Sequence, residues 1–325
     1  MFAFGQKSFV LLDDRGVVRV SGPEARPFLQ GLVTNDVDKA VFGHVLYAAL
    51  LTPQGKYLHD FFIVVLPDEG GGESLYLDCE RKRAADLVAR LTAYKLRSKV
   101  TIENATERFR VIALLGDGPH DSEALHGFEG RGGPFAGGVC YVDPRYAGVG
   151  ARGLLPASGL NELVEAGFTE QEPEYYERLR LYYGLPDGSR DLPVEKALLL
   201  EANFDHLNAI DWQKGCYIGQ ELTARTHYRG LVRKRLLPVE IEGALPPFGS
   251  PVMDDNREIG EMRSSFDGYG IAYLRLDELE RAVDADRALK AADATLNVLH
   301  PGWLKDEPAR EGGADAPAGA PPGRE

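Results

Sequence analysis

One cysteine of this chain lies in a segment whose residue types favour a reactive thiol. Lys214–Glu221 reads Lys-Gly-Cys-Tyr-Ile-Gly-Gln-Glu, and the residues after it have the spacing of a helix over 218–225. A thiol at a helix N-terminus loses its proton more readily, because the helix dipole and the nearby Lys214 stabilise the thiolate. Gly215 would let the backbone turn tightly there. The alternative is that Cys216 is a small buried apolar residue, as free cysteines often are.

Two further arrangements of these residue types would carry chemistry. Cys216 with His206 or His227 would supply the nucleophile and the base of a cysteine hydrolase. The seven histidines are scattered without metal-ligand spacing, so we expect no metal site or complete iron–sulfur site within one chain. A basic cluster is interpreted equally well as an anion site or as a solvated strand end; it comprises Arg225, His227, Arg229, Arg233, Lys234 and Arg235.

A single carboxylate also stands out, because it follows a run of leucines. Glu201 lies in the apolar segment 197–204 and is followed by Asn203 and Asn208. A carboxylate accepts two parallel hydrogen bonds, which suits the N–H edge of a ring such as a pterin. From the residues alone, solvation at a helix end is the preferred interpretation of Glu201.

Length, charge and cysteine content narrow the expected number of domains, the kinds of partner and the cellular compartment. A chain of 325 residues predicts two or three domains. Its net charge of −13 excludes nonspecific nucleic-acid binding over the whole surface, and we expect no direct nucleic-acid contact. The three cysteines are far apart, which indicates a reducing compartment. We see no leader pattern and no membrane-spanning apolar run, and therefore expect a cytoplasmic protein of bacterial type.

The elements that must position these residues fall into three predicted units, 1–108, 109–232 and 233–304, followed by a disordered acidic tail over 305–325. The first two units mix strands and helices. The third contains short strands separated by Gly, Pro and Asp-Asn turns, which predicts a small β-barrel or sandwich. We also predict a hairpin around residues 13–16 and a Gly-rich surface connection over 127–138. Predicted strands are 9–12, 17–20, 47–51, 57–66, 99–102, 110–116, 236–241, 251–253, 258–263 and 270–276, and predicted helices are 23–32, 80–94 and 174–183.

Several stretches resemble the YgfZ-type folate-binding proteins, which are relatives of the glycine-cleavage T-protein, an aminomethyltransferase. The most specific is the motif carried by Lys214, Gly215, Cys216, Tyr217, Gly219, Gln220 and Glu221. Phe28–Val37 and Tyr47–Lys56 resemble the family's N-terminal helix, loop and following strand. The continuation 222–227 and residues 233–236 look closest to the mitochondrial-type iron–sulfur assembly factor branch. The resemblance runs from about residue 9 to about residue 276.

The resemblance implies an α+β fold of the T-protein type, with three domains around a central channel that holds tetrahydrofolate. Cys216 matches the signature cysteine of the family, and Glu201 matches the carboxylate that holds the pterin in the transferase relatives. Asn208 and Arg225 are the other expected folate contacts.

One departure from the transferase pattern concerns the catalytic aspartates. The relatives carry a Gly-Gly-x-x-Asp-Asp-like segment, and the corresponding run here is 55–60. His59 replaces one aspartate while Asp60 remains as a candidate catalytic residue. This departure argues against aminomethyl transfer.

The resemblance therefore predicts a tetrahydrofolate-binding accessory factor for assembly or maintenance of [4Fe–4S] enzymes, including tRNA-modifying ones. Its expected partners are folate, the iron–sulfur assembly machinery and client enzymes, with no membrane and no intrinsic metal. The alternative is a tetrahydrofolate-dependent aminomethyl- or methyltransferase, for which Asp60 is the motivation. A third hypothesis is a scaffold that binds partner proteins and no folate.

Overall fold

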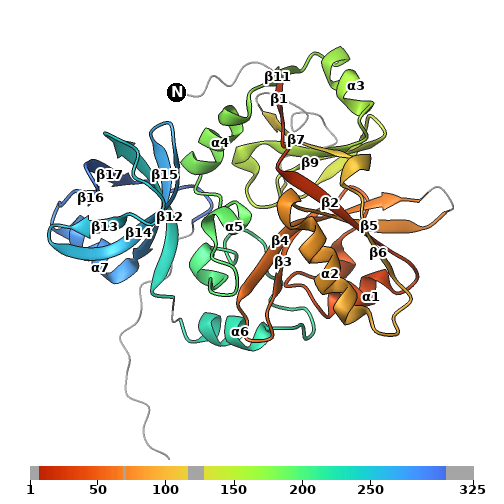
Figure 1. The fold of residues 1–325 in the computed structure, drawn as a ribbon, viewed down its shortest axis with the longest axis horizontal. Helices are drawn as coiled ribbons and strands as arrows, with labels where there is room; N and C mark the ends of the chain where they lie inside the picture. Colours follow the sequence, from red (N-terminus) through yellow and green to blue (C-terminus); the bar gives the residue numbers. More distant parts are fainter. Residues whose placement is uncertain (1–6, 69–70, 116–127, 231, 305–325) are drawn as a thin grey trace, which may run out of the picture.

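The computed structural model of the chain describes residues 7–68, 71–115, 128–230 and 232–304, and the tail predicted over 305–325 lies outside them. Two β-sheets share an apolar cluster, and a β-barrel lies beside them with short helices in between (Figure 1). The predicted α+β fold with a small C-terminal barrel is confirmed. No helix of the described residues is long and apolar enough to cross a membrane.

The first sheet has the strand order β3-β4-β5-β2-β6, and its neighbouring strands are antiparallel. Alternate residues of a strand face opposite sides of a sheet. Phe61 therefore packs beneath two helices, whereas Phe62 packs toward the second sheet. The elements are β2 (Arg15–Ser21), β3 (Leu46–Leu51), β4 (Tyr57–Pro67), β5 (Glu73–Glu80), β6 (Thr101–Asn104), α1 (Ala25–Gln30) and α2 (Ala84–Lys95).

The second sheet has the strand order β11-β1-β7-β10-β9-β8, in which only the β1–β11 pair is parallel. Helix α3 covers its outer face, where Leu163 packs with Phe9 and Ile112. The elements are β1 (Ser8–Leu11), β7 (Arg110–Leu115), β8 (Gly132–Phe135), β9 (Gly138–Val142), β10 (Ala151–Leu155), α3 (Gly159–Glu165) and β11 (Thr169–Gln171). The predicted boundary between the first two domains lies at residues 108 and 109, and this sheet contains strands from both sides of it. The domain boundaries stay predictions.

Two local expectations are wrong. The predicted hairpin around residues 13–16 does not form, because β1 pairs with β7 while β2 pairs with β5 and β6. The turn instead carries the chain from one sheet to the other, where the buried Arg15 bonds the Asp78 side chain at 2.7 Å. Within the predicted surface connection 127–138, residues 132–135 form the edge strand β8, paired with β9.

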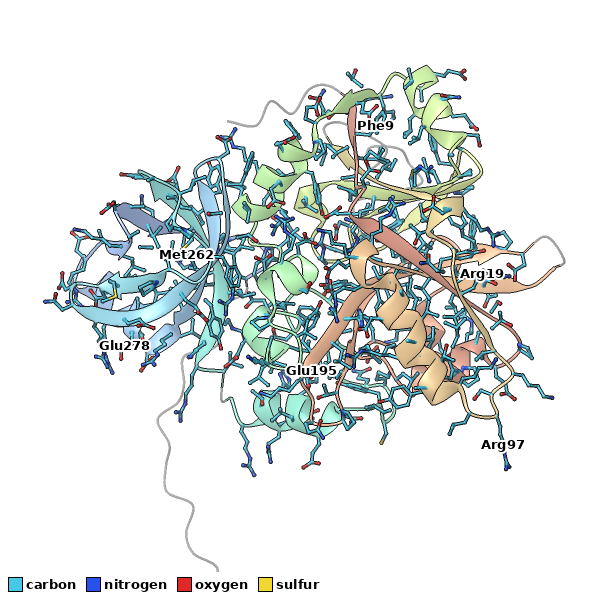
Figure 2. The ribbon with its side chains drawn as sticks, in the orientation of Figure 1. Phe9, Arg19, Arg97, Glu195, Met262 and Glu278 are labelled. Carbon is cyan, nitrogen blue, oxygen red and sulfur yellow. The ribbon has the colours of Figure 1, made fainter. Side chains whose placement is uncertain are left out.

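The C-terminal strands close into a barrel in the order β12-β15-β14-β13-β16-β17. Its interior is apolar around the fully buried Met262 (Figure 2). The elements are β12 (Lys234–Glu242), β13 (Pro251–Asp254), β14 (Arg257–Phe266), β15 (Tyr269–Arg275), α7 (Leu276–Asp284), β16 (Leu289–Ala291) and β17 (Ala294–Val298). Between sheets and barrel lie α4 (Pro173–Tyr182), α5 (Gly188–Asp191) and α6 (Gln220–Tyr228). Short 3-10 turns occupy Val37–Lys39, Arg81–Arg83, Thr106–Arg108, Ala147–Val149 and Leu200–Ala202.

A buried carboxylate joins the two sheets. Asp78 of β5 is fully buried and accepts from Arg15 at 2.7 Å and from Arg152 of β10 at 2.8 Å. Arg152 also lies over the Phe62 ring, 4.2 Å from its centroid. Removing one partner of a buried ion pair leaves an uncompensated buried charge, which costs far more than losing an exposed pair.

We therefore expect Asp78→Asn to lower the free energy of unfolding by about 3–5 kcal/mol. The matched control is Glu107→Gln, which removes the exposed partner of Arg81 and should cost at most about 1 kcal/mol. Urea unfolding followed by circular dichroism measures both. Equal effects of the two substitutions would contradict the proposed role of Asp78.

Candidate functional site

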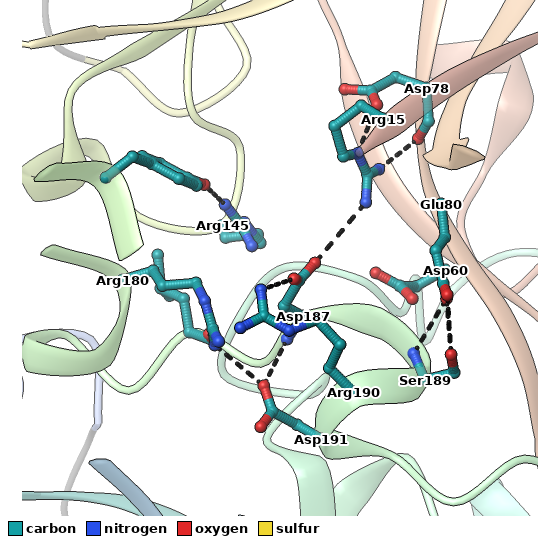
Figure 3. A network of polar contacts seen from close by, with 12 residues as sticks. Arg15, Asp60, Asp78, Glu80, Arg145, Arg180, Asp187, Ser189, Arg190 and Asp191 are labelled. Carbon is teal, nitrogen blue, oxygen red and sulfur yellow. Dashed lines mark hydrogen bonds and ion pairs between the residues drawn. The ribbon is translucent and has the colours of Figure 1, made fainter. Parts of the chain in front are cut away.

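The main candidate site is a central cavity of about 480 Å³ between the two sheets, α4 and α5. Each of its five arginines pairs with a carboxylate, so the wall is polar without a large net charge. Figure 3 shows the ion pairs of Arg15, Arg180 and Arg190. Small-molecule cavities in proteins have volumes of roughly 300–1,000 Å³, and this one lies within that range. The arginines are Arg15, Arg145, Arg152, Arg180 and Arg190.

Asp60 of β4 lines this cavity. Its carboxylate accepts hydrogen bonds from the Tyr47 hydroxyl at 2.8 Å and the Tyr57 hydroxyl at 2.6 Å. Burial raises the pKa of Asp60 above its ordinary value, and Arg15 and the two hydroxyls offset only part of that rise. Sequence reasoning missed both tyrosines, although each is the lone hydroxyl-bearing residue of a predicted strand.

His59, the residue that departs from the transferase pattern, points to the other side of the sheet. Its Nε2 lies 2.8 Å from the Asp86 carboxylate of α2. Burial, assisted by the charge of Arg83, lowers the pKa of His59 to about 4, so the ring is neutral at neutral pH. The replacement therefore leaves the wall of the central cavity unchanged.

Glu201 lies in a second cavity of about 240 Å³, on the barrel side. It accepts a hydrogen bond from the Tyr273 hydroxyl at 2.6 Å. Arg180 lines the central cavity and Asp191 lines the second one, and their 2.9 Å ion pair forms part of the wall between them (Figure 3). Asp60 and Glu201, both predicted site residues, are thus on opposite sides of this wall.

The other two predicted folate contacts line neither cavity. Asn208 is exposed, and its side chain donates to the Pro144 carbonyl at 3.0 Å. Arg225 is exposed on α6. The structure therefore does not bring Glu201, Asn208 and Arg225 together, and their role in folate binding stays a prediction.

Cys216 is exposed in the loop before α6. The helix predicted over 218–225 begins at Gln220 instead, so Cys216 lies four residues before the helix rather than directly at its N-terminus. Nor does Lys214 direct its N–H groups at the thiol. Its ammonium donates to three backbone carbonyls, those of Gln30 at 2.9 Å, Val33 at 2.6 Å and Asn35 at 2.7 Å. An ammonium has three donors, so all are used, and burial lowers the pKa of Lys214 to about 8.

The glycine that the loop requires is Gly219 rather than Gly215. Gly219 has φ 82°, and an added Cβ would lie 2.5 Å from the Thr52 carbonyl oxygen. A Cβ on Gly55, in the β3–β4 turn, would in turn lie 2.8 Å from the Gly219 carbonyl oxygen. A Cβ on Gly215 would meet nothing within 4 Å. The loop thus packs closely on the turn before β4.

Further bonds hold the rest of the motif in place. The Tyr217 N–H donates to the Gln220 side chain at 3.1 Å, and the Ile218 N–H donates to the Gly31 carbonyl at 3.1 Å. Glu221 is exposed. His227 stacks on Trp212 with ring centroids 3.8 Å apart, an arrangement that offers no support for a cysteine hydrolase. Among the described residues, no group of three or more His, Cys, Asp or Glu side chains could hold a metal ion.

Because Lys214 ties the loop to residues 30–35, we expect Lys214→Met to lower the free energy of unfolding by about 2 kcal/mol or more. Amide exchange at Ile218 should accelerate, while exchange in β4 stays slow. Hydrogen exchange with mass spectrometry measures both, with the exposed Lys196→Met as control. Unchanged exchange at Ile218 would show that Lys214 does not hold the loop.

Comparisons with known proteins agree with this architecture. Residues 12–130 match the GCVT N-terminal domain, and residues 233–306 match the CAF17 C-terminal beta-barrel domain. The fold is similar to that of the glycine cleavage system aminomethyltransferase T from Bartonella henselae, with a TM-score of 0.71, 15% identity, and coverage of 92% of this chain and 87% of that chain. This likeness confirms the predicted T-protein-like fold.

The curated relatives carry the name of an iron–sulfur cluster assembly factor. The mitochondrial factor IBA57 is 38% identical in Mus musculus and 35% identical in Homo sapiens, and each alignment covers 90% of this chain and 84% of the relative. The Mycosarcoma maydis homolog is 32% identical over 84% of this chain and 75% of the relative.

These relatives bear on two expectations. They are mitochondrial proteins, so the expectation of a bacterial cytoplasmic protein is contradicted. The narrower assignment to the YgfZ-type proteins stays a prediction. With a GCVT-type N-terminal domain, a CAF17-type barrel and these identities, the chain belongs to the family of the iron–sulfur cluster assembly factor IBA57.

Proposed function

We propose that this protein acts in iron–sulfur cluster assembly through the thiol of Cys216. The names of its relatives support the process, and the presentation of Cys216 supports the residue. The clients in this proposal are [4Fe–4S] enzymes, tRNA-modifying ones among them.

The observation that carries the proposal is the contrast among the three cysteines. Cys79 and Cys140 are buried, and burial raises the pKa of each thiol to about 12. Neither can meet another protein as a thiolate. Cys216 is exposed on a loop that Lys214 bonds to Val33 and that packs through Gly219 on the turn before β4. It is therefore the one cysteine of the chain that a partner can reach.

Complementation of cells that lack the factor tests this proposal. We expect Cys216→Ala to lose restoration of [4Fe–4S] enzyme activity while its melting temperature stays near that of the wild type, because the side chain is exposed. Cys140→Ala is the matched control and should restore activity wherever the protein folds. Full restoration by Cys216→Ala would remove the thiol from the mechanism.

We further propose that the central cavity binds a folate. Its volume of about 480 Å³ suits a ligand of this size, whereas the second cavity, at about 240 Å³, falls below the usual range. Each Asp60 oxygen accepts one tyrosine hydroxyl and retains a lone pair for an N–H edge. Arg190, whose side chain is 47% exposed, would meet the glutamate carboxylates of the ligand.

Calorimetric titration with tetrahydrofolate separates the two candidate carboxylates. We expect Asp60→Asn to weaken binding about tenfold or more, since a charge-assisted hydrogen bond contributes about 1.5–3 kcal/mol. Glu201→Gln should bind like the wild type, because Glu201 lies beyond the Arg180–Asp191 wall. The opposite ranking would move folate to the second cavity, and no binding by the wild type would favour a scaffold without folate.

A second candidate function is a tetrahydrofolate-dependent aminomethyl- or methyltransferase. It is favoured by Asp60, which remains in the central cavity with a raised pKa suited to proton transfer. Turnover of an aminomethyl-lipoyl carrier or a methylated amine, lost in Asp60→Asn, would support it. No turnover with any such donor would reject it.

A further inference from the structure

The second cavity contains two opposite charges whose hydrogen-bonding capacity the fold does not use up. It has a volume of about 240 Å³ and lies between residues 191–202 and the barrel strands β12, β14 and β15. Glu201 lines one side of it, and Arg263 of β14 lines the other. We propose that this cavity binds a small free amino acid with an apolar side chain. Arg263 meets the carboxylate of this ligand, and Glu201 meets its ammonium group.

Arg263 supplies the donors for a carboxylate. Its side chain is only 7% exposed, and Nη2 donates to Glu261 at 2.7 Å. Its Nε is buried and, like Nη1, donates to no described residue. Arg180, which lines the central cavity, instead donates from all three of its nitrogens. Buried polar groups nearly always have a partner, so the unused N–H groups of Arg263 indicate a ligand with acceptor oxygens.

Two aromatic rings fix the guanidinium group of Arg263. It lies 5.2 Å from the ring centroid of Tyr273 and 5.3 Å from that of Phe248. The hydroxyl of the same tyrosine donates to Glu201 Oε2 at 2.6 Å. Tyr273 therefore positions both charges, one over its ring and one at its hydroxyl. A preorganised pair loses little conformational freedom on binding, so more of the contact energy appears as affinity.

The charges that line the second cavity favour a ligand that carries both signs. Glu201 Oε1 accepts no hydrogen bond from a described residue and is available to an ammonium group. Lys196 and Arg263 balance Glu201 and Glu261, while Asp191 is neutralised by Arg180 in the wall. A ligand with a single charge would leave one of these groups unmatched, whereas a zwitterion pairs with both.

The rest of the lining is apolar, which sets the size and the kind of ligand. A cavity of about 240 Å³ falls below the usual range for drug-sized ligands, so the ligand has to be small. Its aliphatic part would be removed from water against this surface, which favours binding. The apolar lining residues are Leu192, Pro193, Ala197, Leu198, Ala202 and Leu236.

Calorimetric titration of the full chain with three related compounds tests the proposal. L-Leucine carries both charges, L-leucinamide lacks the carboxylate, and 4-methylpentanoate lacks the ammonium group, while the apolar part stays the same. We expect leucine to bind and each of the other two to bind about tenfold more weakly or less, since each loses a charge-assisted contact. Equal affinities for all three compounds, or no binding of leucine, would overturn the proposal.

Substitutions of the two charged residues should change the ligand preference in opposite ways. Arg263→Gln should weaken leucine binding about tenfold and remove the preference for leucine over leucinamide, while the preference over 4-methylpentanoate stays. Glu201→Gln should show the reverse pattern, which a folding defect would not produce. Arg257→Gln, on the same strand but 58% exposed, is the matched control and should bind like the wild type. Unchanged preferences in both variants would remove the two residues from the site.

A competition titration separates this site from the proposed folate site. Saturating tetrahydrofolate should leave the affinity for leucine unchanged, because the Arg180–Asp191 ion pair lies in the wall between the cavities. Displacement of leucine by tetrahydrofolate would overturn the proposal of a separate site. If tetrahydrofolate does not bind at all, the folate proposal fails, and the preferences among the three compounds still decide the amino-acid site.

Discussion

The arrangement of the molecule depends on one buried carboxylate, Asp191. It accepts four hydrogen bonds, from Arg180 at 2.9 Å, from the Asp187 N–H at 2.8 Å, and from the N–H and hydroxyl of Ser264 at 3.1 Å and 2.6 Å. These donors come from α4, the turn before α5 and β14 of the barrel. Burying a charge is tolerated only when its partners are this complete. The same bonds hold β14 of the barrel to α5 and form part of the wall between the two cavities.

Successive side chains of a strand face opposite sides of its sheet, so the polar residues of β4 point in two directions. The strand register shifts near Leu58, and afterwards His59 and Phe61 face α2 while Asp60 and Phe62 face the central cavity. A substitution at position 59 therefore changes a contact with a helix, and one at position 60 changes the cavity. This is why the departure from the transferase pattern at His59 has little bearing on what the cavity can bind.

The sequence patterns predicted the positions of helices and strands better than the contacts that those elements make. β4, α4 and the barrel strands β12, β13, β14 and β15 lie within a few residues of their predicted positions, because apolar periodicity is a local property. The last two barrel strands, β16 and β17, were not predicted. The pairing of β1 with β7 and the direction of the Lys214 side chain depend on residues far along the chain, which local patterns do not report. The edge strand β8 was missed because its glycines are typical of loops. Cys216 was found because its neighbours are unusual, yet the glycine that its loop needs is Gly219.

The central cavity and the loop that carries Cys216 are connected through the turn before β4. The turn that contains Gly55 packs without a gap on Gly219, and β4 begins two residues later with Tyr57, which binds Asp60. Transmission of a change between two sites needs an element with two stable arrangements. The structure shows one arrangement of Gly55 and Gly219, in direct backbone contact and with no space for a Cβ on either. A ligand that orders Tyr57 and Asp60 would therefore restrain the turn on which the Cys216 loop packs.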